Sequence, residues 1–273
     1  MDLTVEELAQ TIDHTVLKPQ TKRSKVKQLC EEALRYGFAA VCINSVQVEY
    51  AVELLKDSDV KVCSVVGFPL GAMLSHIKAM EAREAVKLGA HEIDMVMNVG
   101  ALRDENYDLV QSDIEGVVAA SGDAHVKVIL ETGLLIDDQK RKACEICKEA
   151  GADFVKTSTG FGPMGATPYD VRLMRETVGK SMGVKAAGGI RNFKDAWRML
   201  EAGANRLGTS SGVAIIEDFR WAKYSDSWLE EDKPCWTCPS RLANFSKQPT
   251  EVYLWYKQRC VTCPDREYNV FTD

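Results

Sequence analysis

Apolar and polar residues alternate along this chain in a recurring order of short apolar runs and longer amphipathic stretches. The apolar runs that resemble strands are residues 11–17, 38–42, 60–68, 90–98, 126–133, 152–158, 183–189 and 204–210. Between them, apolar residues recur at i, i+3, i+4 and i+7, as in the sets Val26, Leu29, Cys30, Ala33, Leu34 and Val48, Ala51, Val52, Leu55. This spacing predicts helices with one buried face. Strands that alternate with helices predict a parallel sheet.

Glycines mark the ends of several predicted helices. Gly37, Gly89, Gly151 and Gly203 each stand directly before an apolar run. A glycine just past a helix ends it in the left-handed conformation at little cost. Their intervals of 52, 62 and 52 residues are about twice one strand–helix unit. Eight such units predict a (β/α)8 TIM barrel. An open doubly wound sheet would carry a nucleotide fingerprint after its first strand, and none is present there.

The last fifty residues have a different composition. Residues 222–273 hold nine of the 21 aromatic residues and two C-x-x-C pairs, and they lack the strand–helix pattern. We therefore expect a barrel over residues 1–221 and a small cysteine-rich appendage over residues 222–273.

Charge and hydropathy narrow the class of protein. The formal net charge is −6 with a pI near 5.4, which disfavours a nucleic-acid-binding surface. The sequence holds no apolar run of 18 residues, and its first residues, MDLTVEELAQ, do not resemble a secretory signal. A cytoplasmic enzyme without a membrane or nucleic-acid partner is expected.

Charged residues interrupt four successive apolar runs. They are Asp94, Lys127, Lys156 and Lys185. Burying a charge is costly unless it is paired or functional, and barrel enzymes carry their active sites at the C-terminal ends of strands. The set predicts one active site inside the barrel.

Lysine chemistry follows from that set. A lysine is a nucleophile only when its amine is neutral, so its pKa must fall from about 10.4 towards ~7. A second lysine in a desolvated pocket lowers it by like-charge repulsion. Lys156 and Lys185, on adjacent strands, suit this arrangement, with Asp94 moving protons. The hypothesis is a Schiff-base aldolase with Lys156 as the nucleophile.

Two small-residue loops follow the last two predicted strands. They are AAGGIR (186–191) and LGTSSG (207–212). Barrels often bind phosphate at this position through loop amides and a helix N-terminus. The predicted phosphate-binding residues are Gly188, Gly189, Gly208, Ser210 and Ser211.

A third glycine cluster, GFGPMG (160–165), matches a dinucleotide-binding pattern. The next strand, GVKAAGG, ends without the acidic residue that such a site requires. We interpret the cluster as a loop that shapes the substrate entrance, and we expect no cofactor for catalysis.

The motifs IDHTVL, EIDMVMNVGAL, VKVILETG, FVKTSTGF, VKAAGGIR and GTSSG, in this order over residues 1 to about 218, closely resemble the deoxyribose-phosphate aldolase family. The resemblance implies a metal-independent class I aldolase that cleaves 2-deoxy-D-ribose 5-phosphate to glyceraldehyde 3-phosphate and acetaldehyde. It implies a Schiff base on Lys156 and proton transfer by Lys185 and Asp94. The residues implied for the substrate pocket are Asp13, Cys42 and Lys127. A sugar phosphate and an aldehyde are the expected partners, and a homo-oligomer is left open.

Three alternatives stay open at this point. Another Schiff-base aldolase on the same barrel would share Lys156 but accept a different aldehyde. A non-enzymatic sugar-phosphate binder would need no lysine pair. In the third alternative, the main function of the protein lies in the appendage, which is a protein-interaction module fused to the barrel.

The appendage carries a metal-binding pattern. Cys235 and Cys238 are separated by 21 residues from Cys260 and Cys263, which matches the spacing of a four-thiolate zinc site. About fifty residues bury too little apolar surface to fold unaided, and a metal would offset the ordering entropy. A structural zinc in a ribbon-like module is predicted. The alternatives are two disulfides, which a reducing cytoplasm disfavours, and an aromatic flap on the barrel.

Overall fold

The computed structural model describes residues 3–224. Its strands are β1 (Ile12–Thr15), β2 (Ala40–Ile43), β3 (Lys61–Val66), β4 (Glu92–Val96), β5 (His125–Ile129), β6 (Phe154–Lys156), β7 (Gly183–Ala187) and β8 (Arg206–Thr209). Its helices are α1 (Val5–Ala9), α2 (Arg23–Tyr36), α3 (Val48–Leu55), α4 (Ser75–Lys87), α5 (Val99–Arg103), α6 (Tyr107–Ser121), α7 (Asp137–Glu149), α8 (Pro168–Val178), α9 (Phe193–Glu201) and α10 (Gly212–Tyr224), with 3-10 turns at Ser45–Gln47 and Thr132–Leu134.

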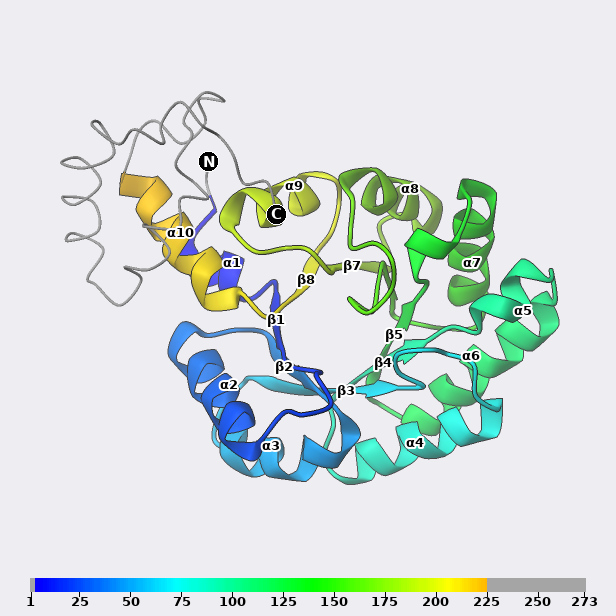
Figure 1. Ribbon diagram of the computed structural model, residues 1–273, viewed down its shortest axis with the longest axis horizontal. Helices are drawn as coiled ribbons and strands as arrows, with labels where there is room; N and C mark the ends of the chain where they lie inside the picture. Colours follow the sequence, from blue (N-terminus) through cyan, green and yellow to red (C-terminus); the bar gives the residue numbers. More distant parts are fainter. Residues whose placement is uncertain (1–2, 225–273) are drawn as a thin grey trace.

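The eight strands form one closed parallel barrel. Each strand pairs with the next in chain order, and β8 pairs with β1. The helices surround the strands, with α1 beside α10 (Figure 1). The (β/α)8 fold predicted from the sequence is confirmed, and each predicted run contains or overlaps one strand.

Local sequence explains where the helices begin and end. Gly37, Gly89, Gly151 and Gly203 all have positive φ, from 66° to 109°, so the residues expected to end helices do so in the left-handed region. At the other end, the Thr167 side chain caps α8, and Pro168 occupies its first turn. Leu34 departs from the expected buried face of α2, because its side chain is 45% exposed.

Alternation along each strand decides which side chains face the barrel axis. Ile93 and Met95 on β4, and Val126 and Val128 on β5, belong to the main apolar core that packs under the helices. Successive strand residues point to opposite faces, so the residues between them point inward. A shift of one residue would expose the apolar set, so the register is firmly held. The barrel interior therefore receives Asp94 and Lys127.

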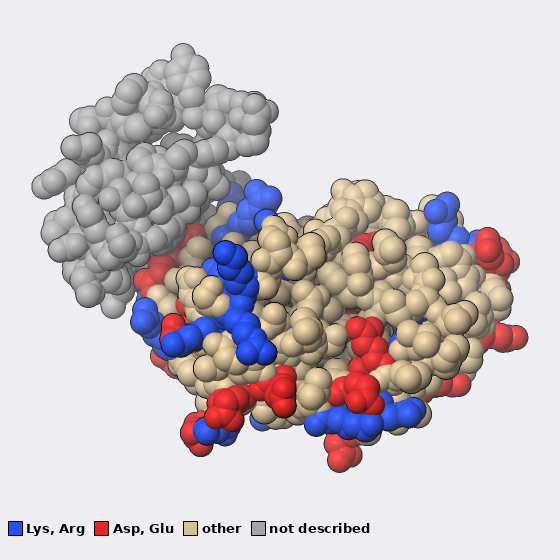
Figure 2. All heavy atoms as spheres, turned by 60° about the horizontal axis from the view of Figure 1, so that its bottom comes forward, with Lys and Arg blue, Asp and Glu red and all other residues tan. Residues whose placement is uncertain are grey.

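Helix α10 continues to Tyr224, so the domain boundary expected at residue 221 falls within this helix. The appendage and its four cysteines, Cys235, Cys238, Cys260 and Cys263, lie outside the described residues. Within residues 3–224, no helix is long and apolar enough to cross a membrane. On the face shown in Figure 2, acidic and basic side chains are interspersed and do not form a single basic stripe.

Candidate active site

Asp94 is the centre of a buried cluster of charges inside the barrel. Its Oδ2 accepts hydrogen bonds from the Nζ atoms of Lys156 and Lys185, both at 2.7 Å. Its Oδ1 accepts one from Lys127 Nζ at 3.0 Å. The structure thus brings together all four charged strand residues noted in the sequence, from β4 to β7.

A second layer of charges lies nearer the start of the strands. Arg206 donates from Nε to Asp13 and from a terminal nitrogen to Glu92, each at 2.6 Å. Asp13 also accepts from Lys185, and Glu92 accepts from Lys127 at 2.7 Å. The sequence analysis missed Glu92 and Arg206. Glu92 stands two residues before Asp94 on the same strand, so period-two alternation could have placed it inside.

The cluster contains three carboxylates and four cations, listed as Asp13, Glu92, Asp94, Lys127, Lys156, Lys185 and Arg206. Its formal net charge is therefore +1. Every charge has an opposite neighbour within hydrogen-bond distance, which is the condition under which buried ions are tolerated.

These neighbours set the protonation states. Burial alone would raise the pKa of Asp94, but Lys127, Lys156 and Lys185 hold it well below its usual range. Burial opposes ionisation of Asp13 as well, yet Lys185 and the other nearby cations lower its pKa to about 2. Burial alone would lower the pKa of Lys185, but Asp13 and Asp94 raise it. Both aspartates are therefore ionised, and Lys185 is protonated.

Lys156 occupies the most accessible place among the three lysines. It ends β6 and is 3% exposed, whereas Lys127 and Lys185 are completely buried. It is directly opposite Lys185 in the β6–β7 register. Both amines contact the same oxygen of Asp94, so in this resting arrangement the carboxylate offsets part of the repulsion that was expected between them.

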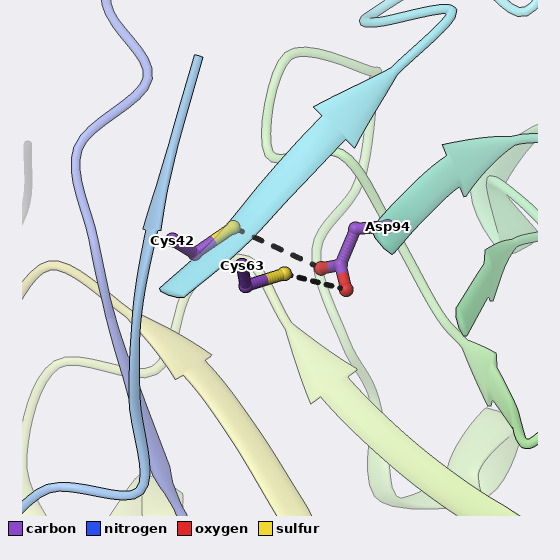
Figure 3. Close-up of side chains that lie close together, drawn as sticks. All are labelled: Cys42, Cys63 and Asp94. Carbon is purple, nitrogen blue, oxygen red and sulfur yellow. Dashed lines mark hydrogen bonds between the residues drawn. The ribbon is translucent and has the colours of Figure 1, made fainter. Parts of the chain in front are cut away.

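Two thiols face the same carboxylate (Figure 3). Cys42 on β2 and Cys63 on β3 point toward Asp94, with Sγ–oxygen distances of 3.9 Å and 3.1 Å. Cys42 was expected in the pocket from the family resemblance. The sequence analysis did not identify Cys63 as a site residue, because the apolar residues around it do not show that β4 lies beside it.

The segment after Lys156 is fixed by the end of the preceding strand. The Thr132 backbone N–H donates to Thr157 at 3.0 Å. Glu131, buried and with φ of 54°, accepts from both the backbone N–H and the hydroxyl of Thr159. A non-glycine residue in this backbone region costs of order 1–3 kcal/mol and persists only where its surroundings hold it. Glu131 therefore positions the loop that follows Lys156.

The predicted phosphate-binding residues lie beside one another after β7 and β8, which pair. Gly188 and Gly189 have φ of 87° and 82°, a conformation that favours glycine. Ser210 is exposed, and Ser211 is half-buried just before α10. Gly208 is different: it is buried within β8, where a Cβ would lie 2.9 Å from Ala187 Cβ and 3.1 Å from Lys185 Cε. Close packing against these two side chains of β7 accounts for that glycine.

A cavity of about 830 Å³ opens at the opposite end of the barrel. The first residues of β3, β4, β5, β6 and β8 line it, so it lies at the N-terminal ends of the strands. In barrel enzymes this end contributes stability, and chemistry occurs at the other. Lys156 ends β6 at the other, C-terminal end of the strands, which makes it the candidate active-site lysine.

Comparison with known proteins identifies the family of this chain. The DeoC/LacD family aldolase profile matches residues 7–218. A deoxyribose-phosphate aldolase of Caldanaerobacter subterraneus is 60% identical over 216 residues, which are 78% of this chain and 94% of the relative. One of Lactococcus lactis is 59% identical and covers 76% and 94%.

Solved structures agree with the sequence relatives. The aldolase QR15 is 42% identical with a TM-score of 0.76, covering 80% of this chain and 98% of that one. A tetrameric deoxyribose phosphate aldolase from Aeropyrum pernix is 37% identical with a TM-score of 0.75, covering 80% and 92%. A dihydrodipicolinate synthase from Bacillus anthracis, 12% identical, shares the fold alone. The chain belongs to the DeoC/LacD family of aldolases.

Proposed function

We propose that this chain reversibly cleaves 2-deoxy-D-ribose 5-phosphate to D-glyceraldehyde 3-phosphate and acetaldehyde through a Schiff base on Lys156. The single observation that carries the proposal is the amine of Lys156 at the end of β6, 2.7 Å from a carboxylate that Lys185 also contacts. The sequence relatives named above carry this activity in their names and span most of the chain. These relatives favour this activity over that of the other aldolases considered in the sequence analysis.

The reaction divides into steps that the cluster can serve. The neutral Lys156 amine attacks the substrate aldehyde carbon C1, and loss of water from the carbinolamine gives an iminium ion. A base takes the proton of the C3 hydroxyl, the C2–C3 bond breaks, and its electron pair moves to the iminium to form an enamine. Protonation at C2 and hydrolysis then release acetaldehyde and restore the amine.

Asp94 and Lys185 are the proposed proton carriers. Asp94 is an acceptor because the three lysines hold it as a carboxylate. Lys185 is a donor because two carboxylates keep it charged. Together they supply the proton that leaves with water and receive the one that the substrate hydroxyl gives up. Lys127 and Asp13 orient this pair through the contacts described above.

The substrate phosphate is proposed to bind between the two loops after β7 and β8. Gly188 and Gly189 leave the backbone N–H groups accessible, and Ser210 and Ser211 add hydroxyl donors before the N-terminus of α10. Cys42 faces the same space as Asp94 and is proposed to contact the substrate chain.

Borohydride trapping tests the proposal. Acetaldehyde and borohydride should add one two-carbon group at Lys156 faster than at surface amines, and peptide mass spectrometry identifies the site. Lys156→Leu should lose both the rapid adduct and turnover, while Lys180→Leu, which removes an exposed lysine, is the matched control. A rapid adduct on Lys185 or Lys127 would refute the assignment, and so would wild-type cleavage by Lys156→Leu.

Assembly and location belong to the same proposal. One structural relative is described as tetrameric, and we propose a homo-oligomer in the cytoplasm for this chain. Light scattering after size-exclusion chromatography measures the assembly, and a monomer at all concentrations would contradict it.

A further inference from the structure

Two thiols and one carboxylate, all of them metal-binding groups, lie close together inside the barrel on adjacent strands. Cys42 and Cys63 are directly opposite each other in the β2–β3 register, and Asp94 follows on β4. All three are buried, and their ligand atoms lie within 4.8 Å of one another. Figure 3 shows both thiols directed at the two oxygens of the carboxylate.

The spacing suits a tetrahedral ion. Zinc binds thiolate sulfur at about 2.3 Å and carboxylate oxygen at about 2.1 Å, so two such ligands are about 3.6 Å apart. Cys63 Sγ is 3.1 Å from one oxygen of Asp94 and Cys42 Sγ is 3.9 Å from the other, and these two distances bracket this value. A rotation of the carboxylate that turns one oxygen toward both sulfurs would complete the geometry, with one position left for water.

We propose that Cys42, Cys63 and Asp94 form a binding site for a thiophilic divalent cation, Zn²⁺ or Cd²⁺, and that its occupation blocks the active site. The three residues would bind it as two thiolates and one carboxylate. Two sulfur ligands favour these ions over Mg²⁺ and Ca²⁺, which prefer oxygen.

The ion can bind beside three lysines because its binding leaves the formal charge of the cluster unchanged. The ion brings two positive charges, and two thiol protons leave to solvent as both thiolates form. The formal charge of the cluster therefore stays at +1. Lys127, whose Nζ is 3.6 Å from Cys63 Sγ, would then face a thiolate in place of a thiol.

Occupation would compete with the lysines for Asp94. Lys127 contacts Oδ1, and Lys156 and Lys185 contact Oδ2, so an ion at either oxygen removes acceptor capacity from them. Binding itself does not depend on the reaction proposed above, but inhibition rests on it, because it requires Asp94 to carry protons for Lys156.

Cadmium titration of reduced protein tests the binding. The four appendage cysteines, Cys235, Cys238, Cys260 and Cys263, are first replaced by serine, since they form a separate predicted metal site. This parent should still bind one Cd²⁺ per chain and develop the ultraviolet sulfur-to-metal charge-transfer band. Cys63→Ala should lose most of that band and weaken binding by more than the ~10–100-fold that removal of an outer partner costs. Cys147→Ala, which removes a buried thiol on α7, should change neither.

Several outcomes decide the question. A full charge-transfer band in Cys63→Ala, or none in the parent at equimolar Cd²⁺, would overturn the site; Cys42→Ser repeats the test if Cys63→Ala does not fold. Inhibition of cleavage should follow the same titration curve and reverse with a chelator. Stoichiometric binding without inhibition would overturn the blocking effect. A parent that shows the band but cleaves no substrate without metal would instead refute the proposed function.

Discussion

Replacing Asp94 by asparagine is the sharpest test of the buried cluster. The change keeps the shape of the side chain but removes the charge that three ammonium groups share at 2.7, 2.7 and 3.0 Å. It also raises the formal charge of the cluster from +1 to +2. Two separable losses are expected, one in turnover and one in stability.

The magnitudes follow from the roles assigned to Asp94. General acid–base catalysis contributes ~10²–10⁴-fold, so kcat should fall within that range. Removing one partner of a buried ion pair costs about 3–5 kcal/mol, because an uncompensated charge is left behind. At about 2–4 °C per kcal/mol for a chain of this size, the melting temperature should fall by roughly 6–20 °C. The Lys156 adduct should still form, because its amine is unchanged.

A second buried aspartate provides the matched control. Asp113 on α6 accepts from Lys78 at 2.5 Å, and both side chains are buried between the helix layer and β4. Asp113→Asn should lower the melting temperature by a similar amount and leave kcat and the pH–rate profile unchanged. Steady-state kinetics, calorimetry and borohydride trapping on both variants give the comparison. Equal losses of kcat in the two variants would refute a chemical role for Asp94, and so would wild-type turnover in Asp94→Asn.

Four further predictions concern other residues of the chain. Lys185→Leu removes the cation between two carboxylates and should lower kcat by ~10²–10⁴-fold, with the adduct still on Lys156; an adduct formed elsewhere would contradict this. Gly189→Val places a branched side chain at φ of 82° and should raise KM for the phosphorylated sugar at least tenfold more than for free deoxyribose, as initial rates on both substrates would show. The pKa of Asp13 falls from 3.8 in the unfolded chain to about 2 in the fold, so its stabilisation is present above pH ~4 and lost between pH ~4 and ~2; acid unfolding of Asp13→Asn should lack this part of the transition. Elemental analysis of protein purified without added metal should find zinc that is lost when Cys235, Cys238, Cys260 and Cys263 are replaced by serine, and its absence from folded, reduced protein would end that prediction.

Period-two alternation is what made much of the barrel and its site predictable. Ile93 and Met95 must face the helices, so Asp94 between them must face the axis, and the same reasoning holds for Lys127 between Val126 and Val128. Because β4, β5, β6 and β7 are neighbours in a closed barrel, their inward-pointing residues lie close together. Local apolar patterns therefore indicated the fold and the central charges together.

The missed residues depend on contacts that local patterns do not contain. Arg206 reaches Asp13 across 193 residues of sequence, and Cys63 reaches Asp94 only because β3 pairs with β4. Lys78 shows the same limit on a helix, where a lysine at an interior position resembles a solvated one until α6 supplies its partner. Strand register and helix packing determine the partners of such residues, and neither can be seen in the local sequence.

Position, more than residue type, distinguishes the two central lysines. Lys185 is fully buried. Its amine donates hydrogen bonds to one oxygen of Asp13 and one oxygen of Asp94, and these two carboxylates raise its pKa. A carbonyl carbon could reach its amine only by displacing these carboxylates, and the amine would first have to give up a proton that they hold. Lys156 contacts Asp94 from the C-terminal end of β6, two positions beyond Phe154, which is the register partner of Lys127. The same carboxylate can therefore keep Lys185 charged as a proton donor while it orients the amine of Lys156.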